Sequence, residues 1–304
     1  MELKLSSPQD CIGDFTYNFI WQHKGAKLKP EAPIPAQIDT SYTYQEVVEA
    51  LKSGENVRIK GDVGTRIGSS LGVDLVYFGG KGKELPAVGS ILVENNAGSH
   101  LGLSMLSGAI YVKGDVAEPL GNIVQVESDL DGYKKFVAIT WLLHHPEERA
   151  RNALLAPNEF KDGALVLADR IVRHTLAARC TTDSTVRVKG NVGISVGILM
   201  RKGQVVVDGN AGMNAAALLN GGTVVVLGAA AEFLGVELRK GVIFVKGSVK
   251  GYVGAKMTGG RIICKRTKPI PPARETQLER EDQALLSRYG VAGMMAMNYG
   301  RYEV

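Results

Sequence analysis

Gln204-Val-Val-Val-Asp-Gly209-Asn-Ala repeats, after a step of 19 residues, the pattern of Thr185-Val-Arg-Val-Lys-Gly190-Asn-Val. The same step places a glycine at Gly190, Gly209, Gly228 and Gly247, and it is also seen earlier in the chain, at Asn95 and Gly114. A fixed period of this length indicates one structural element that is stacked many times, rather than a series of unrelated motifs.

Seven copies align on this glycine and share two aliphatic columns. The column four residues before the glycine contains Val57, Ile91, Ile110, Val186, Val205, Val224 and Ile243, and the column two residues before it contains Ile59, Val93, Val112, Val188, Val207, Val226 and Val245. Polar residues such as Lys189 and Asp208 stand next to the second column. The alternation has the period of two that is typical of a strand, with one face in the core and the other in water.

A turn is expected after each strand. An acid or an amide follows the glycine position in five copies, at Asp62, Asn96, Asp115, Asn191 and Asn210. Glycine lacks a Cβ atom and Asn tolerates a left-handed backbone, so the pair predicts a sharp bend. One unit cannot bury its own apolar columns, and successive units therefore have to stack, with strands about 4.8 Å apart. The sequence predicts an all-β fold, a single-stranded parallel β-helix, right-handed because parallel crossovers almost always are.

Breaks in the repeat suggest five segments. We expect an N-terminal cap with a short helix at 1–55, a first block of coils at 56–121, a mixed and partly helical insertion at 122–185, a second block at 186–266, and a C-terminal arm with a helix at 267–304. Capping boxes are expected to open the two helices, Thr43 with Glu46 and Thr276 with Glu279. The first coil carries an additional Gly- and Lys-rich loop at 72–87. The terminal segments are expected to cover the open ends of the β-helix or to embrace another subunit.

Composition argues against several classes of protein. With 45% hydrophobic residues and a mean hydropathy near zero, the chain has the material for a soluble globular protein. Its first residues are unlike a signal peptide, and no apolar stretch is long enough to span a membrane, so we expect a cytoplasmic protein. Cys11, Cys180 and Cys264 are far apart and form no CxxC pattern, so they predict neither an iron–sulfur cluster nor a zinc site.

The net charge is +5, and part of it lies in one late run without acids, at Arg261, Lys265, Arg266, Lys268 and Arg274. No aromatic residue is interleaved there for base stacking, and the net charge is far below that of a nucleic-acid-binding domain. We interpret these cations as a solvated face or as a contact with a partner subunit, and we expect no nucleic-acid partner.

Glycine pairs invite a nucleotide-binding interpretation. However, Gly61-x-x-Gly64-x-x-x-Gly68 has the wrong spacing for a dinucleotide fingerprint, and the pattern recurs in every coil. A phosphate-binding P-loop is absent, because Gly82-Lys83 is followed by Glu84 instead of Ser or Thr. These glycines are therefore interpreted as corners of the coils.

Gly193-Ile-Ser195-Val-Gly197 matches the G-x-S-x-G pattern of serine hydrolases, which requires a strand–turn–helix elbow. Both glycines belong to repeat columns. All five histidines precede Ser195, which excludes the chain order of α/β-hydrolases: His23, His100, His144, His145 and His174. A triad in another order stays an alternative.

His144 and His145, with Glu147, Glu148 and His174, form the one cluster in the sequence that suggests a metal site. Adjacent residues of a helix diverge by about 100°, so at most one of the two histidines shares a face with either acid. We therefore predict no catalytic, cofactor-binding or metal-binding residue in this chain.

The columns V-x-V-x-G-[DN]-x-G-x-x-x-G-x-x-[ML]-x-x-G resemble the GXGXG family of β-helices. They are seen in Val205-Val-Val-Asp-Gly209-Asn-Ala-Gly212 and in Gly254-Ala-Lys-Met257-Thr-Gly-Gly260. Members of that family form the C-terminal domain of the large subunit of glutamate synthase and the C subunit of formylmethanofuran dehydrogenase. The resemblance covers about 150 residues, and a free-standing chain with its own leader and tail is more similar to the second.

This resemblance implies a non-catalytic scaffold within an oxidoreductase complex of one-carbon metabolism and methanogenesis. In such a complex, a subunit with a tungsten or molybdenum pterin reduces CO2 to formate. An amidohydrolase-like subunit with two metal ions then condenses formate with methanofuran, and iron–sulfur clusters are also carried by other subunits. Three alternatives stay open: a stand-alone GXGXG domain of a glutamate synthase-type amidotransferase, the C subunit of a formyltransferase/hydrolase complex, and a hydrolase that uses Ser195.

Overall fold

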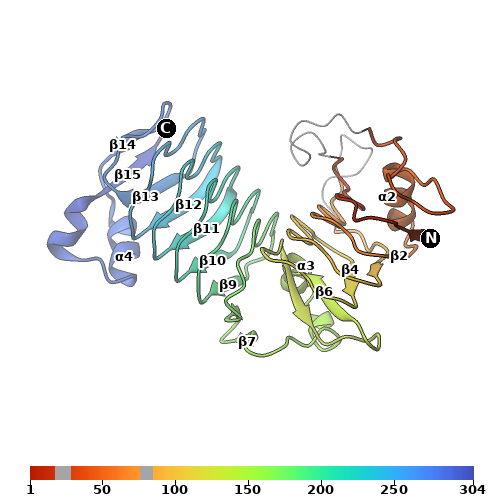
Figure 1. Ribbon diagram of the computed structural model, residues 1–304. Helices are drawn as coiled ribbons and strands as arrows, with labels where there is room; N and C mark the ends of the chain where they lie inside the picture. The colour runs from red at the N-terminus through yellow and green to blue at the C-terminus, as the bar shows by residue number, and fades with distance from the viewer. Residues whose placement is uncertain (18–28, 76–84) are drawn as a thin grey trace. The chain divides into compact units, whose positions relative to one another are not determined.

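The computed structural model describes residues 1–17, 29–75 and 85–304 (Figure 1). Its contacts divide the chain into two compact units, Met1–Leu155 and Ala156–Val304. Within the described residues, the first unit contains a 6-stranded sheet and the second a 9-stranded sheet. Most of the regular structure is strand, and both units are built from stacked coils, so the predicted parallel β-helix is confirmed.

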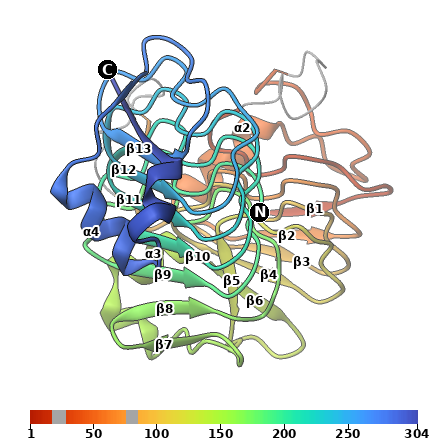
Figure 2. The same cartoon turned by 90° about the vertical axis from the view of Figure 1, so that its left-hand side faces the viewer.

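The second unit shows the regular coils most clearly (Figure 2). One strand per coil pairs in parallel with the next, in the order β8 (Ala164–Leu167), β9 (Thr185–Val188), β10 (Gln204–Val207), β11 (Asn220–Val226), β12 (Lys240–Val245) and β13 (Arg261–Lys265). The register places Val205 on Val186 and on Val224, so each repeat column becomes a ladder. Val205, Val207 and Val226 are fully buried, because the ladders fill the interior of the coil.

Another part of each regular coil is a corner of alternating left-handed residues. Every second residue there has a positive φ, in the sets Ser195, Gly197 and Leu199; Asn214, Ala216 and Leu218; Phe233, Gly235 and Glu237; and Tyr252, Gly254 and Lys256. This backbone costs about 1–2 kcal/mol for each residue other than glycine. Hydrogen bonds between coils offset that cost, as from the Ala216 amide to the Val196 carbonyl at 2.8 Å. The corner is therefore favourable only in a stack.

The turn glycines have a different role from the one predicted. Gly190, Gly209, Gly228 and Gly247 do not have the positive φ that a left-handed bend requires. Instead, a Cβ atom on Gly209 would lie 2.4 Å from Asn191 Oδ1 and 2.6 Å from the Gly190 carbonyl oxygen. At Gly209, Gly228 and Gly247, glycine is needed because consecutive coils approach closely at this turn.

The amides after these glycines also act between coils. Asn191 Oδ1 accepts a hydrogen bond from the Asn210 amide at 2.8 Å, and Asn210 Oδ1 accepts one from the Ala229 amide at 2.8 Å. Neither asparagine has a left-handed backbone. Each side chain therefore satisfies a backbone donor of the next coil, which explains why this column selects Asn and Asp.

Residues 122–185, for which we expected a partly helical insertion, contain a further coil. Leu165 in β8 pairs with Val186 in β9, and the Gly193 amide donates to the Arg173 carbonyl as the Gly212 amide does to Val192. Six positions separate Leu167 from Arg173, where four separate Val188 from Val192. This irregular spacing hides the columns from a 19-residue alignment. The antiparallel strand β7 (Glu159–Lys161) borders the coil.

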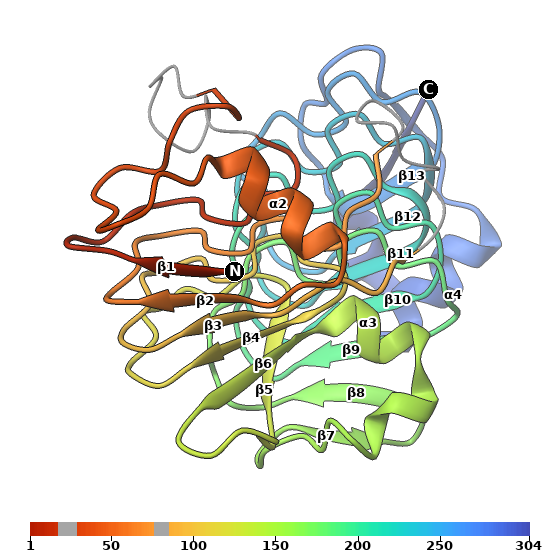
Figure 3. The same cartoon turned by 90° about the vertical axis from the view of Figure 1, so that its right-hand side faces the viewer.

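The first unit stacks β1 (Glu2–Lys4), β2 (Val57–Lys60), β3 (Ile91–Val93) and β4 (Ala109–Val112) in parallel (Figure 3). The strands β5 (Ile123–Val126) and β6 (Lys134–Ala138) then form a hairpin, and β6 pairs antiparallel with β4. This reversal ends the parallel stack. The short helices α3 (Ile139–His144) and η2 (Pro146–Arg149) follow β6 directly.

Helix α2 (Tyr44–Lys52) covers the N-terminal coil and begins at the predicted capping box of Thr43 and Glu46. Its buried face includes Val47, Val48 and Leu51. The added loop of the first coil lies in part outside the described residues, at 76–84. Pairing of Val57 with Ile91 nevertheless shows that the coil resumes its register after the loop.

The C-terminal segment folds onto its own unit. It consists of β14 (Arg274–Thr276), α4 (Arg280–Arg288), η3 (Gly293–Asn298) and β15 (Tyr299–Glu303). Strand β15 runs antiparallel to both β13 and β14 and so covers the last parallel edge. The predicted capping box is wrong: Glu279 caps α4 together with Asp282, whereas Thr276 lies in β14.

Gly209→Ala is expected to lower the free energy of unfolding by about 1–3 kcal/mol, because the new Cβ atom overlaps the preceding coil. Gly190→Ala is the matched control, since a Cβ atom there would meet nothing within 4 Å. Urea denaturation followed by circular dichroism measures both. Equal destabilisation by the two substitutions would contradict the close-approach explanation.

Val226→Asp is expected to lower the free energy of unfolding by several kcal/mol, because it buries a carboxyl group in an apolar ladder. Lys189→Gln, which removes an exposed partner of Asp208, should cost less than about 1 kcal/mol. Thermal unfolding of both variants tests the assignment. Unchanged stability of Val226→Asp would show that the inward columns are assigned to the wrong face.

Candidate interaction surfaces

Ser195 is a corner residue of the stack. Its side chain is buried at 7% exposure, its φ is +60°, and its amide donates to the Met213 carbonyl at 2.9 Å. No helix follows it, so the elbow of a serine hydrolase is not formed. Among the described residues, no hydrogen bond joins its hydroxyl to a histidine. This geometry supports a structural role for the G-x-S-x-G match.

The histidines form no metal site in the described part of the chain. His145 stacks on Trp141 with ring centroids 3.8 Å apart and pairs through Nδ1 with Glu147 Oε1 at 2.9 Å. Burial, followed by the nearby charge of His145, lowers the pKa of His144. His174 belongs to the second unit, and His23 lies outside the described residues.

The cysteines and glycine pairs also serve packing. Cys11, Cys180 and Cys264 are buried, and burial raises the pKa of Cys264 to about 12, so its thiol is neutral at physiological pH. Gly64 lies against Asp10, where a Cβ atom would be 2.0 Å from the carboxylate. The Gly82-Lys83 pair lies outside the described residues.

One polar network covers the outer face of the sheet in the first unit. The Glu94 carboxylate accepts hydrogen bonds from Arg58 and from the Tyr133 hydroxyl, each at 2.7 Å, and from Lys113. The hydrogen bond from Lys113, followed by that from Tyr133, holds the pKa of Glu94 below its usual value. The network fastens the β5–β6 hairpin loop to β2, β3 and β4.

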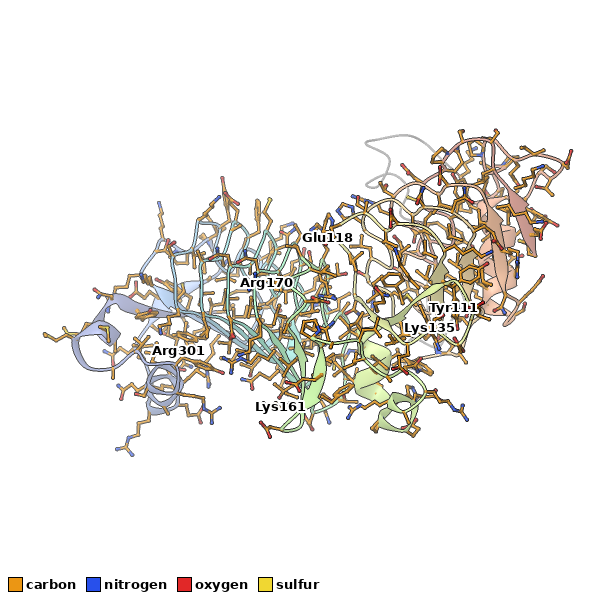
Figure 4. All side chains as sticks on the ribbon, turned by 60° about the horizontal axis from the view of Figure 1, so that its bottom comes forward. Tyr111, Glu118, Lys135, Lys161, Arg170 and Arg301 are labelled. Carbon is orange, nitrogen blue, oxygen red and sulfur yellow. The ribbon has the colours of Figure 1, made fainter. Side chains whose placement is uncertain are left out.

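A second network lies on β4 and β6 (Figure 4). Tyr111 and Lys135 are directly opposite one another in the antiparallel pair, and both reach Asp129, at 2.8 Å and 3.1 Å. Burial, followed by the bond to Asp129, raises the pKa of Tyr111. Tyr111 and Lys135 are each only 7% exposed, so these two groups anchor a loop and are not presented to a ligand.

The outer face of the sheet in the second unit is apolar and covered. Val206, Val225, Phe244 and Ile263 point outward from successive coils and pack with Leu286 of α4, with Val291 and with Tyr299 of β15. The alternation in the sequence predicts that this face is exposed to water, and the cover formed by α4 and β15 is the difference from that prediction. The sequence does contain a sign of this cover. The same column has polar or amphipathic residues in the first unit, at Arg58 and Tyr111, whereas in the covered coils of the second unit it is apolar.

Ion pairs lock this cover in place. The fully buried Asp282 of α4 lies 3.1 Å from Arg261 Nε and accepts from Arg301 Nη1 at 3.2 Å. Arg301 also contacts Glu279 and Glu303, each at 2.7 Å. A surface pocket of about 330 Å³ adjoins the two arginines. Both guanidinium groups are already paired with carboxylates, so we interpret the pocket as a gap in packing and not as a ligand site.

The irregular coil of the second unit contains a buried ion pair. Its arginine, Arg173, stands at the position that Val192 has in the next coil. Arg173 is 2% exposed and binds Asp169 in a bidentate manner, at 2.5 Å and 2.8 Å. Burial alone would raise the pKa of Asp169, but the hydrogen bond and charge of Arg173 outweigh it, with help from Asn158, and hold that pKa below its usual value.

Asp169→Asn is expected to destabilise the protein by about 3–5 kcal/mol at pH 7, because the buried Arg173 would lose its bidentate bond to the Asp169 carboxylate. Since the folded pKa of Asp169 is depressed, its contribution is present above the unfolded pKa of about 3.9 and is lost as the pH falls through the folded value. The difference from the wild type should therefore shrink in acid. Urea denaturation at pH 7 and pH 3 measures it.

The double variant Asp169→Asn with Arg173→Met is the control for this prediction. It should recover much of the lost stability at pH 7, because it removes both buried charges. A difference that stays constant with pH, or no recovery in the double variant, would contradict the assigned role of the pair.

Two sets of apolar side chains are exposed on the second unit. One runs along the left-handed corner, where Ile194 is 37%, Met213 42% and Tyr252 52% exposed, with Phe233 stacked on Tyr252 at 4.7 Å. The other consists of Met294, Met295 and Met297 in η3. Among the described residues of the second unit, these exposed apolar side chains are candidate contacts for a partner.

A comparison with protein-family models finds no match to this chain. A curated protein of Methanothermobacter thermautotrophicus, described as an uncharacterized protein, is 53% identical over 292 residues, which cover 96% of this chain and 92% of the relative. In a solved structure, the formyltransferase/hydrolase complex of Methylorubrum extorquens with methylofuran, one chain is 19% identical. The match covers 98% of this chain and 90% of that one, with a TM-score of 0.26. At this TM-score the likeness supports no functional conclusion.

Among the described residues, none of the helices has the length and apolar character needed to cross a bilayer.

Proposed function

The chain belongs to the same protein family as the Methanothermobacter thermautotrophicus protein, and we propose that it is a structural, non-catalytic subunit of a formylmethanofuran dehydrogenase complex. The observation that carries the proposal is the coil pattern itself. Val205-Val-Val-Asp-Gly209-Asn-Ala-Gly212 resembles the GXGXG coil, and in the structure each of its columns stacks on the equivalent residues of the next coil.

The use of the side chains supports a structural role. Residues that chemistry would need are engaged in packing: Ser195 is buried in a corner, and Asp169 and Arg173 neutralise each other. Glu94 and Asp282 each hold a neighbouring segment in place. In the described part of the chain, no group of His, Cys, Asp or Glu residues is arranged to hold a metal ion. The reaction is therefore assigned to other subunits.

A stack of coils suits a scaffold for a physical reason. Each coil contacts only its neighbours, so the stack presents surface residues at fixed intervals along a rigid body. The proposed partners are a molybdopterin-type subunit with tungsten or molybdenum and an amidohydrolase-like subunit with a dinuclear metal site, with iron–sulfur clusters elsewhere in the complex. We place this assembly in the cytoplasm, as part of one-carbon metabolism.

The runner-up has the same scaffold role in a different complex. A stand-alone GXGXG subunit of a glutamate synthase-type amidotransferase would have amidotransferase and synthase partners. A formyltransferase/hydrolase complex would contain the amidohydrolase-like subunit without the redox subunit. The identity of the partners therefore distinguishes the three.

Affinity purification of the tagged chain from its native source tests the proposal. We expect a molybdopterin-type subunit and an amidohydrolase-like subunit to co-purify in fixed ratio, because a scaffold is stable in its assembly. Mass spectrometry identifies the partners and elemental analysis identifies tungsten or molybdenum. Recovery of the chain as an active monomer, or with amidotransferase partners, would exclude the proposed complex.

A further inference from the structure

Three methionines of η3 are the most exposed large apolar side chains in the described part of the chain. Met294 is 85% exposed, Met297 72% and Met295 58%, whereas Met200 and Met257 in the coils are buried. Large apolar side chains gathered at one place on a surface are typical of interaction sites. Methionine suits this role because its flexible, polarizable side chain adapts to the shape of a partner.

The backbone that carries these methionines is held firmly. The Arg266 amide donates to the Asn298 carbonyl at 2.8 Å, and Arg266 Nε donates to the Met297 carbonyl at 3.2 Å. The Tyr299 hydroxyl donates to the Lys246 carbonyl at 2.5 Å, and Ala296 packs on the apolar cover of the sheet. The methionines are therefore displayed by an ordered segment and are not the frayed end of a chain.

Three cations lie close to η3 along the chain or across the neighbouring strands. Lys246 and Lys265 point outward from successive coils, since they alternate in step with the outward-facing Phe244 and Ile263. Lys265 is also directly opposite Tyr299, the residue that follows η3, and Arg288 ends the helix before η3. Among the described residues, these three cations form no ion pair, and no acid occurs between 283 and 302. This stretch of the chain therefore carries positive charge without an acid of its own.

We propose that Met294, Met295 and Met297, together with Lys265 and Arg288, are the docking surface for an acidic, amphipathic segment of a partner subunit. Acidic side chains of the segment would meet the cations, and its apolar face would cover the methionines. The patch has far fewer residues than the roughly 20–30 that each partner contributes to a standard interface, so it fits one segment better than the face of a second copy.

Other classes of partner fit the patch less well. Membrane-surface segments are amphipathic helices with Trp, Phe or Leu on the apolar face, whereas η3 is a 3₁₀ turn of 6 residues with methionines. Single-stranded nucleic acid requires exposed aromatic rings for stacking, and Tyr299 is buried. This inference rests on the proposed function only in taking the partner to be a subunit of the same assembly.

Methionine oxidation in the native assembly tests the proposal. The assembly and the isolated chain are treated with dilute hydrogen peroxide, and sulfoxide at each methionine is measured by mass spectrometry. Sulfoxide formation at Met294 and Met297 should be at least about fivefold slower in the assembly. The buried Met200 and Met257 should stay slow in both samples and so report that the chain is folded. Equal oxidation rates in the two samples would overturn the proposal.

Charge reversal tests the acidic character of the partner. Lys265→Glu with Arg288→Glu should abolish the protection of Met294 and Met297. Lys161→Glu in β7 is the matched control, since this exposed cation lies at the other end of the second unit (Figure 4). Protection that survives the double reversal would overturn the proposal, as would protection of the isolated chain by phosphatidylglycerol vesicles.

A photo-crosslinker at Met295 identifies the docked segment. The proposal expects crosslinks in the assembly to one partner segment that is rich in Asp and Glu, and a neutral or basic segment would contradict it. The composition of the assembly is read separately. If Met294 and Met297 are protected in an assembly without a molybdopterin-type subunit, the proposed function fails and the docking surface stands. If the expected subunits are present and the methionines oxidise freely, the docking surface fails alone.

Discussion

The structure depends on hydrogen bonds between each coil and the next. The Gly209 amide donates to the Gly190 carbonyl at 2.9 Å, and the Gly228 amide donates to the Gly209 carbonyl at the same distance. This approach leaves no room for a Cβ atom, and the left-handed corners are favourable only when the neighbouring coil supplies their hydrogen bonds. The fold is therefore a property of the stack, because a single coil would keep the strain without the bonds that offset it.

The sequence predicted those parts of the fold that depend on neighbours 19 residues away. The Val205 and Val207 columns became buried ladders, and the Thr43 cap opened a helix as expected. The coil that begins at β8 was missed because two added residues around Asp169 break the period. The turn glycines, such as Gly209, were predicted correctly as turn residues but for the wrong reason. The sequence of one coil indicates only the backbone preferences of that coil, whereas the actual constraint is the close approach of the adjacent coil.

The surfaces were harder to foresee than the core. An outward column of Val206, Val225, Phe244 and Ile263 signals that something covers it, but the cover comes from α4, far along the chain. The expectation that no catalytic residue is present stays a prediction, and the packed positions of Ser195 and Asp169 support it. The covered sheet face and the packed polar residues leave the exposed side chains of the stack as the places where a scaffold would contact its partners.

Hydrogen exchange of the second unit tests the central claim most directly. If hydrogen bonds between coils hold the fold, the amides of Gly209, Asn210 and Gly228 should exchange as slowly as the strand amides of β10 and β11, although they lie in turns. Protection of these turn amides should extend from coil to coil, because each regular coil is hydrogen-bonded to the next. Fast exchange at these turns, with protection confined to the strands, would show that the sheet alone holds the unit together.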